Sequence, residues 1–209
     1  MPALGTIHRF VKRASRVVSA VIAIPFLLSC QALAQSGTWT TKAPMLVARS
    51  GHSVGAIDGM VYVVGGGCGG PPCPVEAYDP KSNIWTTKPP LPTPRAVPVV
   101  AVVGGILYAI GGGYGRVLDT VEAYDPKTDT WRSKAPMRYA RAGHVGAVID
   151  DIIYVAGGVN DSGQPLKSLE AYDPKTNTWT LKASMQAPRY LAAAAAHPRH
   201  AWNFSFWAS

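Results

Sequence analysis

Acidic side chains are scarce in this sequence, and charged residues of both signs make up only 15% of its 209 residues. There are 12 Asp and Glu against 20 Lys and Arg, which gives a formal net charge of +8. Four of the basic residues lie within residues 1–34, which contain no acidic residue, so the remainder has 16 basic and 12 acidic side chains and a charge of +4. Because these remaining charges are spread along the chain rather than clustered, no nucleic-acid partner is expected.

The hydrophobic stretch near the N-terminus is too short to span a bilayer. It covers 13 residues, Val17 to Ser29, whereas a membrane helix needs about 20. A basic stretch precedes it and the small residues Ala32 to Ala34 follow it, which is the layout of a secretory signal peptide. We expect a signal peptide over residues 1–34 and a secreted or periplasmic protein of bacterial type. In the alternative, Leu27 to Cys30 resembles a lipobox, and a lipid on Cys30 would anchor the protein to a membrane.

Cysteine is also scarce, with three in the chain. Cleavage after Ala34 leaves only Cys68 and Cys73, in a loop of Gly and Pro. An exported compartment permits disulfides, and such a loop can bring the two Cα atoms within about 7 Å. A Cys68–Cys73 disulfide is therefore predicted. Two thiols without a nearby His or further Cys are half of a four-ligand set, so no metal or other cofactor is expected.

Glycine and proline, by contrast, are abundant, at 21 and 18 residues, while 47% of the chain is hydrophobic. This composition indicates many short turns, no long helices and an all-β fold with a sizeable core.

One phrase recurs three times: an apolar strand ending in Gly-Gly, then Glu-Ala-Tyr-Asp-Pro, then Trp. Equivalent positions are 46 or 48 residues apart, and a fixed period of this size indicates an array of identical units. The repeated structural residues are Gly65, Gly66, Tyr78 and Trp85; Gly111, Gly112, Tyr124 and Trp131; and Gly157, Gly158, Tyr172 and Trp179.

Each repeat predicts four antiparallel strands. Apolar runs at 53–57 and 60–64 flank Asp58-Gly59, a strong hairpin signal because both turn positions need positive φ. A third strand begins at Val75, and Asp79 to Asn83 form a turn before a fourth strand near Trp85. The second repeat has Gly104-Gly105 at the hairpin turn. The third has Asp150-Asp151, which is a poorer turn sequence.

The Gly-Gly doublet followed by Tyr and Trp seven positions apart resembles the Kelch repeat. The resemblance covers about Trp39 to Ala196 and implies a β-propeller of four-stranded blades, with Tyr and Trp between the blades. No Trp-Asp pair ends a repeat, so a WD-type propeller is disfavoured. The expected organisation of residues 35–196 is a leading strand at 39–46, blades at 49–91, 95–137 and 141–185, and the start of a fourth blade at 189–196.

The pattern stops after Ala196. The tail at 197–209 has neither the doublet nor strand alternation, which favours a frameshift or truncation over the alternative of an aromatic cap. Three complete blades predict a partial, open propeller. Its unpaired edges invite assembly into a homo-oligomer.

Two sets of repeated residues are candidate ligand contacts. Arginines open the first strand of each unit, and the Kelch resemblance implies that this strand lies innermost, near the channel, where they could bind carboxylates. Their recurrence equally suits an architectural role, which we favour. His52 and His144 lie three residues after their arginines, where Pro98 and Ala192 stand in the other units, and are expected to be structural. The four arginines are Arg49, Arg95, Arg141 and Arg189.

The loops after the doublets differ between repeats, at 67–74, 113–120 and 159–168, and function on repeat scaffolds tends to lie in such loops. The candidate contact residues there are Tyr114, Arg116, Asn160 and Asp161. Solvated loop filling is the alternative for all four.

These observations favour a non-enzymatic binding or scaffold module that recognises a protein or a glycan through blade loops. No catalytic residues are assigned. One alternative is a fragment of a Kelch-fold sugar enzyme, similar to copper-dependent galactose oxidases or sialic acid epimerases, although neither an isolated copper-ligand set nor a closed ring is evident. The other is a non-functional truncated gene product.

Overall fold

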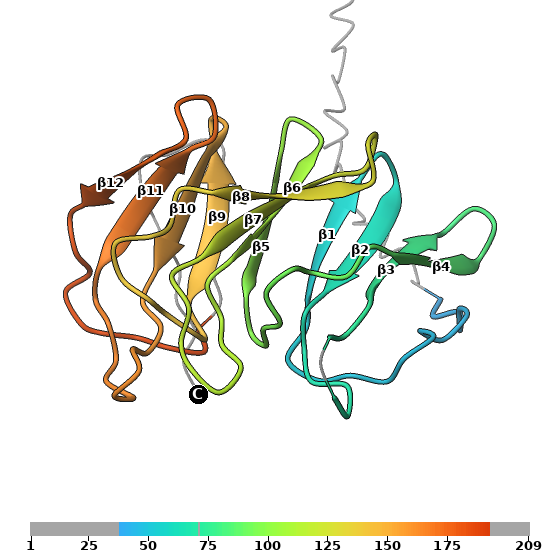
Figure 1. The fold of residues 1–209 in the computed structure, drawn as a ribbon, viewed down its shortest axis with the longest axis horizontal. Helices are drawn as coiled ribbons and strands as arrows, with labels where there is room; N and C mark the ends of the chain where they lie inside the picture. The colour runs from blue at the N-terminus through green and yellow to red at the C-terminus, as the bar shows by residue number, and fades with distance from the viewer. Residues whose placement is uncertain (1–37, 71, 193–209) are drawn as a thin grey trace, which may run out of the picture. The chain divides into compact units, whose positions relative to one another are not determined.

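The computed structural model describes residues 38–70 and 72–192 of the chain. The predicted signal peptide, Cys30 and the tail at 197–209 therefore lie outside the described residues. The described part contains strands and turns but no helix (Figure 1), as the all-β prediction requires. It accordingly contains no helix that could cross a membrane.

The strands form three four-stranded antiparallel sheets, each built from one sequence repeat (Figure 1). Strand order in every sheet follows the chain. Blade 1 comprises β1 (Ser53–Ile57), β2 (Met60–Val64), β3 (Val75–Asp79) and β4 (Ile84–Lys88). Blade 2 comprises β5 (Val99–Val103), β6 (Ile106–Ile110), β7 (Val121–Asp125) and β8 (Thr130–Lys134). Blade 3 comprises β9 (Val145–Ile149), β10 (Ile152–Ala156), β11 (Leu169–Asp173) and β12 (Thr178–Lys182).

The first hairpin of each blade has the boundaries that its turn sequence predicts. Asp58 and Gly59 have φ values of 50° and 81°, the left-handed conformation that a two-residue hairpin turn needs. Asp150 and Asp151 adopt the same conformation, at 50° and 63°, without a glycine. The weaker turn still forms because β9 and β10 pair along their whole length.

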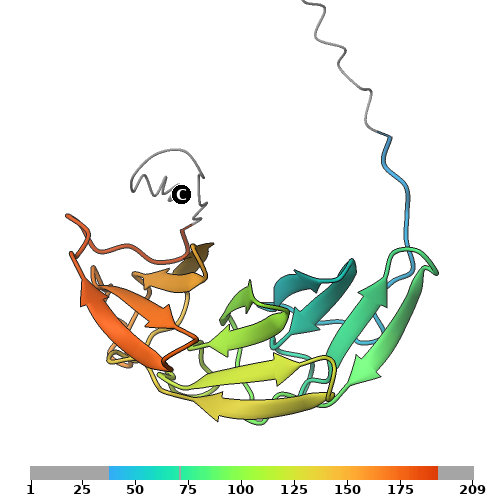
Figure 2. The same ribbon diagram turned by 90° about the horizontal axis from the view of Figure 1, so that it is seen from above.

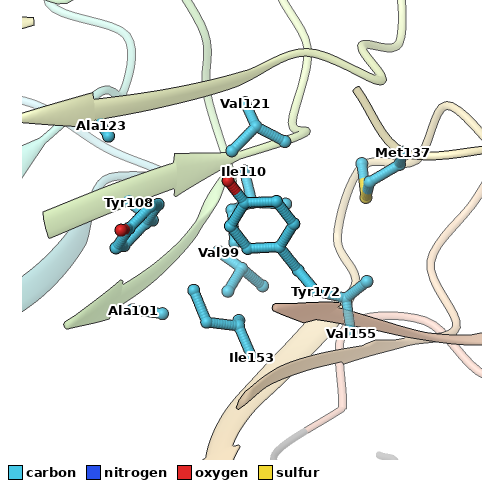
Figure 3. Close-up of a cluster of buried hydrophobic side chains, with 10 residues drawn as sticks. All are labelled: Val99, Ala101, Tyr108, Ile110, Val121, Ala123, Met137, Ile153, Val155 and Tyr172. Carbon is cyan, nitrogen blue, oxygen red and sulfur yellow. The ribbon is translucent and has the colours of Figure 1, made fainter. Parts of the chain in front are cut away.

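The blades pack side by side in chain order (Figure 2). Their first strands lie closest together, since β1 contacts β5 and β5 contacts β9, as expected for innermost strands. Apolar clusters fill the space between neighbouring sheets. Between blades 1 and 2, Tyr62 and Val64 pack with Leu107 and Tyr124. Figure 3 shows the corresponding cluster between blades 2 and 3, where Ile153 and Tyr172 enter from blade 3.

The repeated Tyr and Trp of blades 2 and 3 lie between the blades, as the Kelch resemblance implies. Tyr124 and Tyr172 have no exposed surface. Their rings are tilted against Trp131 and Trp179, with centroids 5.1 and 5.0 Å apart. Burial raises the pKa of the Tyr172 hydroxyl to about 12, so these tyrosines are neutral packing groups.

Residues 39–46, predicted as a leading strand, contain no strand in the structure. The Ala43 carbonyl instead accepts a hydrogen bond from Trp85 Nε1 at 2.8 Å. The Pro89 carbonyl, at the exit of β4, accepts the same bond from Trp131 at 3.0 Å. Ala43 thus corresponds to the residue that follows the last strand of the preceding blade elsewhere. The strand prediction is wrong because residues 41–46 pair with none of the described strands.

The glycine doublets lie where neighbouring backbones approach one another closely. Gly111 and Gly112 have φ values of 57° and 85°. A Cβ on Gly111 would lie 2.7 Å from the Arg141 carbonyl oxygen, and one on Gly112 would lie 2.5 Å from that of Ala96. The Gly112 N–H also donates to the Arg141 carbonyl at 2.9 Å. No side chain fits at these contacts, so glycine is required.

The three blades form an open series rather than a closed ring. Among the described strands, extensive contacts join only consecutive blades. The outer face of blade 3 buries Tyr154, Ala156 and Leu169, which Met185 and Ala192 partly cover. The prediction of a partial propeller with three complete blades is therefore confirmed.

Candidate functional site

Each blade contains a buried ion pair between its repeated arginine and the glutamate of the acidic phrase. The side chains of all three pairs are at most 5% exposed. Burial lowers the pKa of Arg95 and of Arg141, but the paired glutamate counteracts that shift. The nitrogen-to-oxygen distances are 3.1 Å for Arg49–Glu76, 2.9 Å for Arg95–Glu122 and 2.5 Å for Arg141–Glu170.

The same arginines bind backbone carbonyls of their own blade. Arg95 Nη1 donates to the carbonyls of Gly111 and Thr120, at 3.0 and 2.9 Å. Arg49 and Arg141 make the equivalent bonds. Each guanidinium therefore ties the glycine doublet to the start of the third strand. This bonding supports the architectural role and leaves these three side chains with little capacity to meet a ligand.

Arg189 differs from the other three arginines because it is exposed. Its backbone still follows the repeat: its carbonyl accepts the Gly158 N–H at 2.8 Å, and its N–H donates to the Leu166 carbonyl at 3.1 Å. The repeated backbone contact between units thus continues after blade 3.

The ion pair of blade 1 has fewer hydrogen bonds than the others. Thr93 Oγ1 donates to Glu122 Oε1 at 2.7 Å, but Val47 stands at the equivalent position of blade 1. Glu76 lies close to Arg49 without hydrogen-bond geometry, and neither Glu76 oxygen has a hydrogen-bond partner in the structure. Unsatisfied buried carboxylate oxygens reduce the stabilisation that such a pair provides.

The two repeated histidines lie in opposite environments. His52 is exposed, whereas His144 is 7% exposed between blades 2 and 3. Burial lowers the pKa of His144 to about 3, and the Arg141 charge adds to the shift. The Ile110 backbone partly offsets it, but neither ring nitrogen has a hydrogen bond of good geometry. His144 is thus a neutral packing group at ordinary pH, in agreement with the structural role expected for it.

The loop after the first doublet is closed by the predicted disulfide. Cys68 and Cys73 are bonded, with their Cα atoms 5.8 Å apart. Cys73 is buried beside the doublet and Cys68 lies nearer the surface. The bond fixes a loop whose glycines and prolines would otherwise permit many conformations.

The loops of blades 2 and 3 place the four candidate contact residues in two different roles. Asn160 Oδ1 accepts the N–H groups of Ser162 and Gln164, at 3.0 and 2.9 Å, and so shapes its own loop. Asp161 Oδ1 accepts the Val117 N–H at 2.6 Å and joins the two loops. Both side chains therefore contribute to loop structure.

Tyr114 and Arg116 project from the loop of blade 2 instead. Tyr114 is 50% exposed and Arg116 is exposed. Neither side chain makes a hydrogen bond or ion pair with the rest of the described chain. Tyr114 also lines a small pocket with Cys73, Leu91 and Arg95. These two exposed side chains are available for a ligand.

No group of three or more His, Cys, Asp or Glu side chains within residues 38–70 and 72–192 is arranged to hold a metal ion.

The comparisons with known proteins identify the repeats. The Kelch motif matches residues 48–92, 94–138 and 140–186, which is more than half of the chain. The chain belongs to the Kelch-motif family. The three matched segments of this Kelch chain correspond to its three sheets, with the doublet, Tyr and Trp at equivalent places in each blade.

A solved structure titled "Structure of YjhT" is similar to this Kelch chain, with a TM-score of 0.66 and 20% sequence identity. The match covers 76% of this chain and 60% of that one. At this identity, the likeness concerns the fold alone. The chain thus spans less than two thirds of the length of that structure, and no curated protein matches it.

The glutamates Glu76, Glu122 and Glu170 are the residues that the sequence interpretation missed. They were seen as part of a repeated phrase but not as partners of the arginines. Each glutamate follows its arginine by 27 or 29 residues. This recurring offset is the signal that could have indicated the pairing. An arginine and a glutamate that recur together in a mostly apolar chain have to neutralise one another when buried.

Proposed function

We propose that this Kelch chain is a non-enzymatic binding module that recognises a protein or a glycan through the loops that follow the glycine doublets. The proposal rests on the loop of blade 2, in which exposed side chains project from an ordered backbone. Tyr114 and Arg116 project from it without partners, on a backbone fixed by neighbouring contacts. An exposed aromatic and an exposed guanidinium on a rigid loop are typical contact residues of binding surfaces.

The state of the buried ionisable groups favours binding over catalysis. The glutamates are held by arginines, and His144 is enclosed and neutral. An acid–base catalyst needs an ionisable group that can reach a substrate. The exposed loops offer hydrogen-bond donors and an aromatic face, which suit recognition.

The proposal is tested with glycan-array binding and bound-metal analysis of the full chain. Tyr114→Ala and Arg116→Ala should each weaken binding of an array ligand that occupies the loops at least about tenfold, since contacts of this kind contribute roughly 1.5 kcal/mol or more. Lys127→Ala is the control, because Lys127 is exposed in the β7–β8 turn at the opposite end of the blade. One bound copper per chain, or turnover of a sugar substrate, would contradict the proposal.

A further inference from the structure

We propose a second binding site, a groove on blade 2 that binds a hydroxylated monocarboxylate of the size of one sugar ring. The groove has a volume of about 190 Å³. It lies on the face of the blade 2 sheet that packs against blade 3, and no residue of the loops of the proposed function lines it. Its lining consists of Ile106, Tyr108, Ala123, Asp125, Arg132 and Lys134.

Two cations in this groove form no ion pair with a described acidic side chain. Neither Arg132 nor Lys134 makes an ion pair or a side-chain hydrogen bond with the described residues. The equivalent lysine of blade 1, Lys88, lies 4.0 Å from Asp129 of blade 2. In blade 3 the position that corresponds to Asp129 is occupied by Asn177, which has no charge. Lys134 therefore lacks the acidic partner that Lys88 has. An unpaired lysine at a partly covered site attracts an external anion.

Arg132 is a departure from the repeat. Thr86 and Thr180 occupy its position in the other blades, so the forked guanidinium is particular to this groove. Arginine binds a carboxylate through two parallel hydrogen bonds. Asp125 lies in the same lining, which leaves a net charge of +1. A single carboxylate neutralises that charge.

The remaining polar groups call for a ligand with hydroxyls. Tyr108 is 5% exposed, and its hydroxyl has no hydrogen-bond partner in the described chain. Figure 3 places Tyr108 at the Ala101–Ala123 side of the core cluster, away from Met137. Asp125 uses one oxygen to accept the Lys127 N–H at 2.9 Å, which leaves its second oxygen for a ligand donor.

The size of the groove sets the size of the ligand. Pockets for drug-sized molecules are roughly 300–1,000 Å³, so this groove takes a single ring. A sugar acid would place its carboxylate on Arg132 and Lys134. Its hydroxyls would then reach Tyr108 and Asp125. A simple acidic side chain would satisfy the two cations but neither of the other groups.

The full chain is titrated with glucuronate, and binding is measured by calorimetry and NMR. Glucose, glucose 6-phosphate and cyclohexanecarboxylate are the comparison probes: the first lacks the carboxylate, the second carries a phosphate dianion in its place, and the third is a monocarboxylate without ring hydroxyls. We expect glucuronate to bind at least about tenfold more tightly than each of them. Equal binding of cyclohexanecarboxylate would overturn the sugar-acid assignment, and no binding of glucuronate would overturn the site.

Variants test whether glucuronate binds in the groove. Arg132→Thr, which restores the residue of the other blades, should weaken glucuronate binding at least about tenfold. Arg116→Ala in the loop of the proposed function should leave it unchanged, so failure of one site is distinguishable from failure of the other. The double variant Thr86→Arg, Asp129→Asn reproduces both departures around Lys88 of blade 1 and should create a second glucuronate site. Unchanged affinity in Arg132→Thr would contradict the proposal.

Discussion

His144 and His52 occupy the same position of the repeat, three residues after the arginine, yet one is enclosed and the other exposed. The difference arises from the neighbouring sheet: blade 2 covers the face on which His144 lies. At the scale of single residues, a repeated side chain therefore keeps its place in the blade while its environment depends on what packs against the blade.

The enclosure of His144 predicts a pH dependence of stability. Its pKa is about 3 in the folded chain, against an ordinary value of 6.5, so the unfolded chain binds a proton first as the pH falls. The free energy of unfolding should therefore decrease by about 1.4 kcal/mol per pH unit between roughly pH 6 and pH 3 on account of this group. Urea titrations of the wild-type chain and of His144→Ala measure the difference in slope.

The matched control for that prediction is His52→Ala, since His52 is exposed at the equivalent position. It should retain the wild-type slope. The same slope in all three proteins would show that His144 is protonated in the folded state after all.

Val47→Thr should stabilise the chain by about 1 kcal/mol, because the new hydroxyl would donate to Glu76 as Thr93 donates to Glu122. The urea midpoint, at an unchanged denaturant slope, measures the gain. Thr93→Val removes the existing bond and should destabilise blade 2 by a similar or larger amount. If Val47→Thr gave no gain, Glu76 would already have a partner in solution.

At the scale of the element, the blade is a hairpin of fixed register joined to a second hairpin through a variable loop. The loop of blade 1 is closed by Cys68–Cys73, whereas the loops of blades 2 and 3 are joined by Asp161 and Val117. Different local chemistry thus produces ordered loops on identical sheets. This separation of a constant frame from variable loops is what supports recognition at the loops.

A glycine in the hairpin turn of blade 3 should stabilise the chain. Asp151 has a φ of 63° without being glycine, so Asp151→Gly should raise the free energy of unfolding by about 0.5–1 kcal/mol. The exposed ion pair with Lys175 that it removes contributes little. Thermal and urea unfolding test the expectation, and destabilisation by Asp151→Gly would mean that the ion pair outweighs the backbone strain.

At the scale of the whole molecule, the blades are joined by the glycine doublets. Gly111→Ala should destabilise the chain by more than about 3 kcal/mol, since its Cβ would lie 2.7 Å from both the Arg141 carbonyl oxygen and His144 Cε1 of the next blade. Denaturant unfolding measures the loss.

Gly115→Ala is the control for backbone conformation. Its φ is also positive, at 77°, but a Cβ there would meet nothing within 4 Å. It should cost only about 1–2 kcal/mol. Similar losses at both positions would mean that the close approach between blades is not what requires glycine at Gly111.

Much of the fold was predictable from the sequence. The hairpin boundaries, the Tyr and Trp between blades and the Cys68–Cys73 disulfide were all predicted, since each depends on local turn chemistry or on a fixed period. The strand at 39–46 was predicted wrongly. A segment with the sequence of a strand forms one only where another strand accepts its backbone hydrogen bonds.

The candidate sites were less predictable. The loops were identified as variable, but the division between structural Asn160 and Asp161 and projecting Tyr114 and Arg116 depends on distances between loops of different blades. The groove beside Arg132 was not predicted at all. Its lining comes from three strands, and its charge depends on which residue of the next blade faces Lys134.

The sequence by itself determined the repeating unit: three copies of a four-stranded sheet, their turns and their internal packing residues. Local conformational preference and the spacing of apolar residues suffice for that. Only the tertiary structure decided which repeated charges neutralise one another, which histidine is enclosed and which cations remain unpaired. Those outcomes depend on burial and on contacts between neighbouring blades, and a residue's chemistry changes with both.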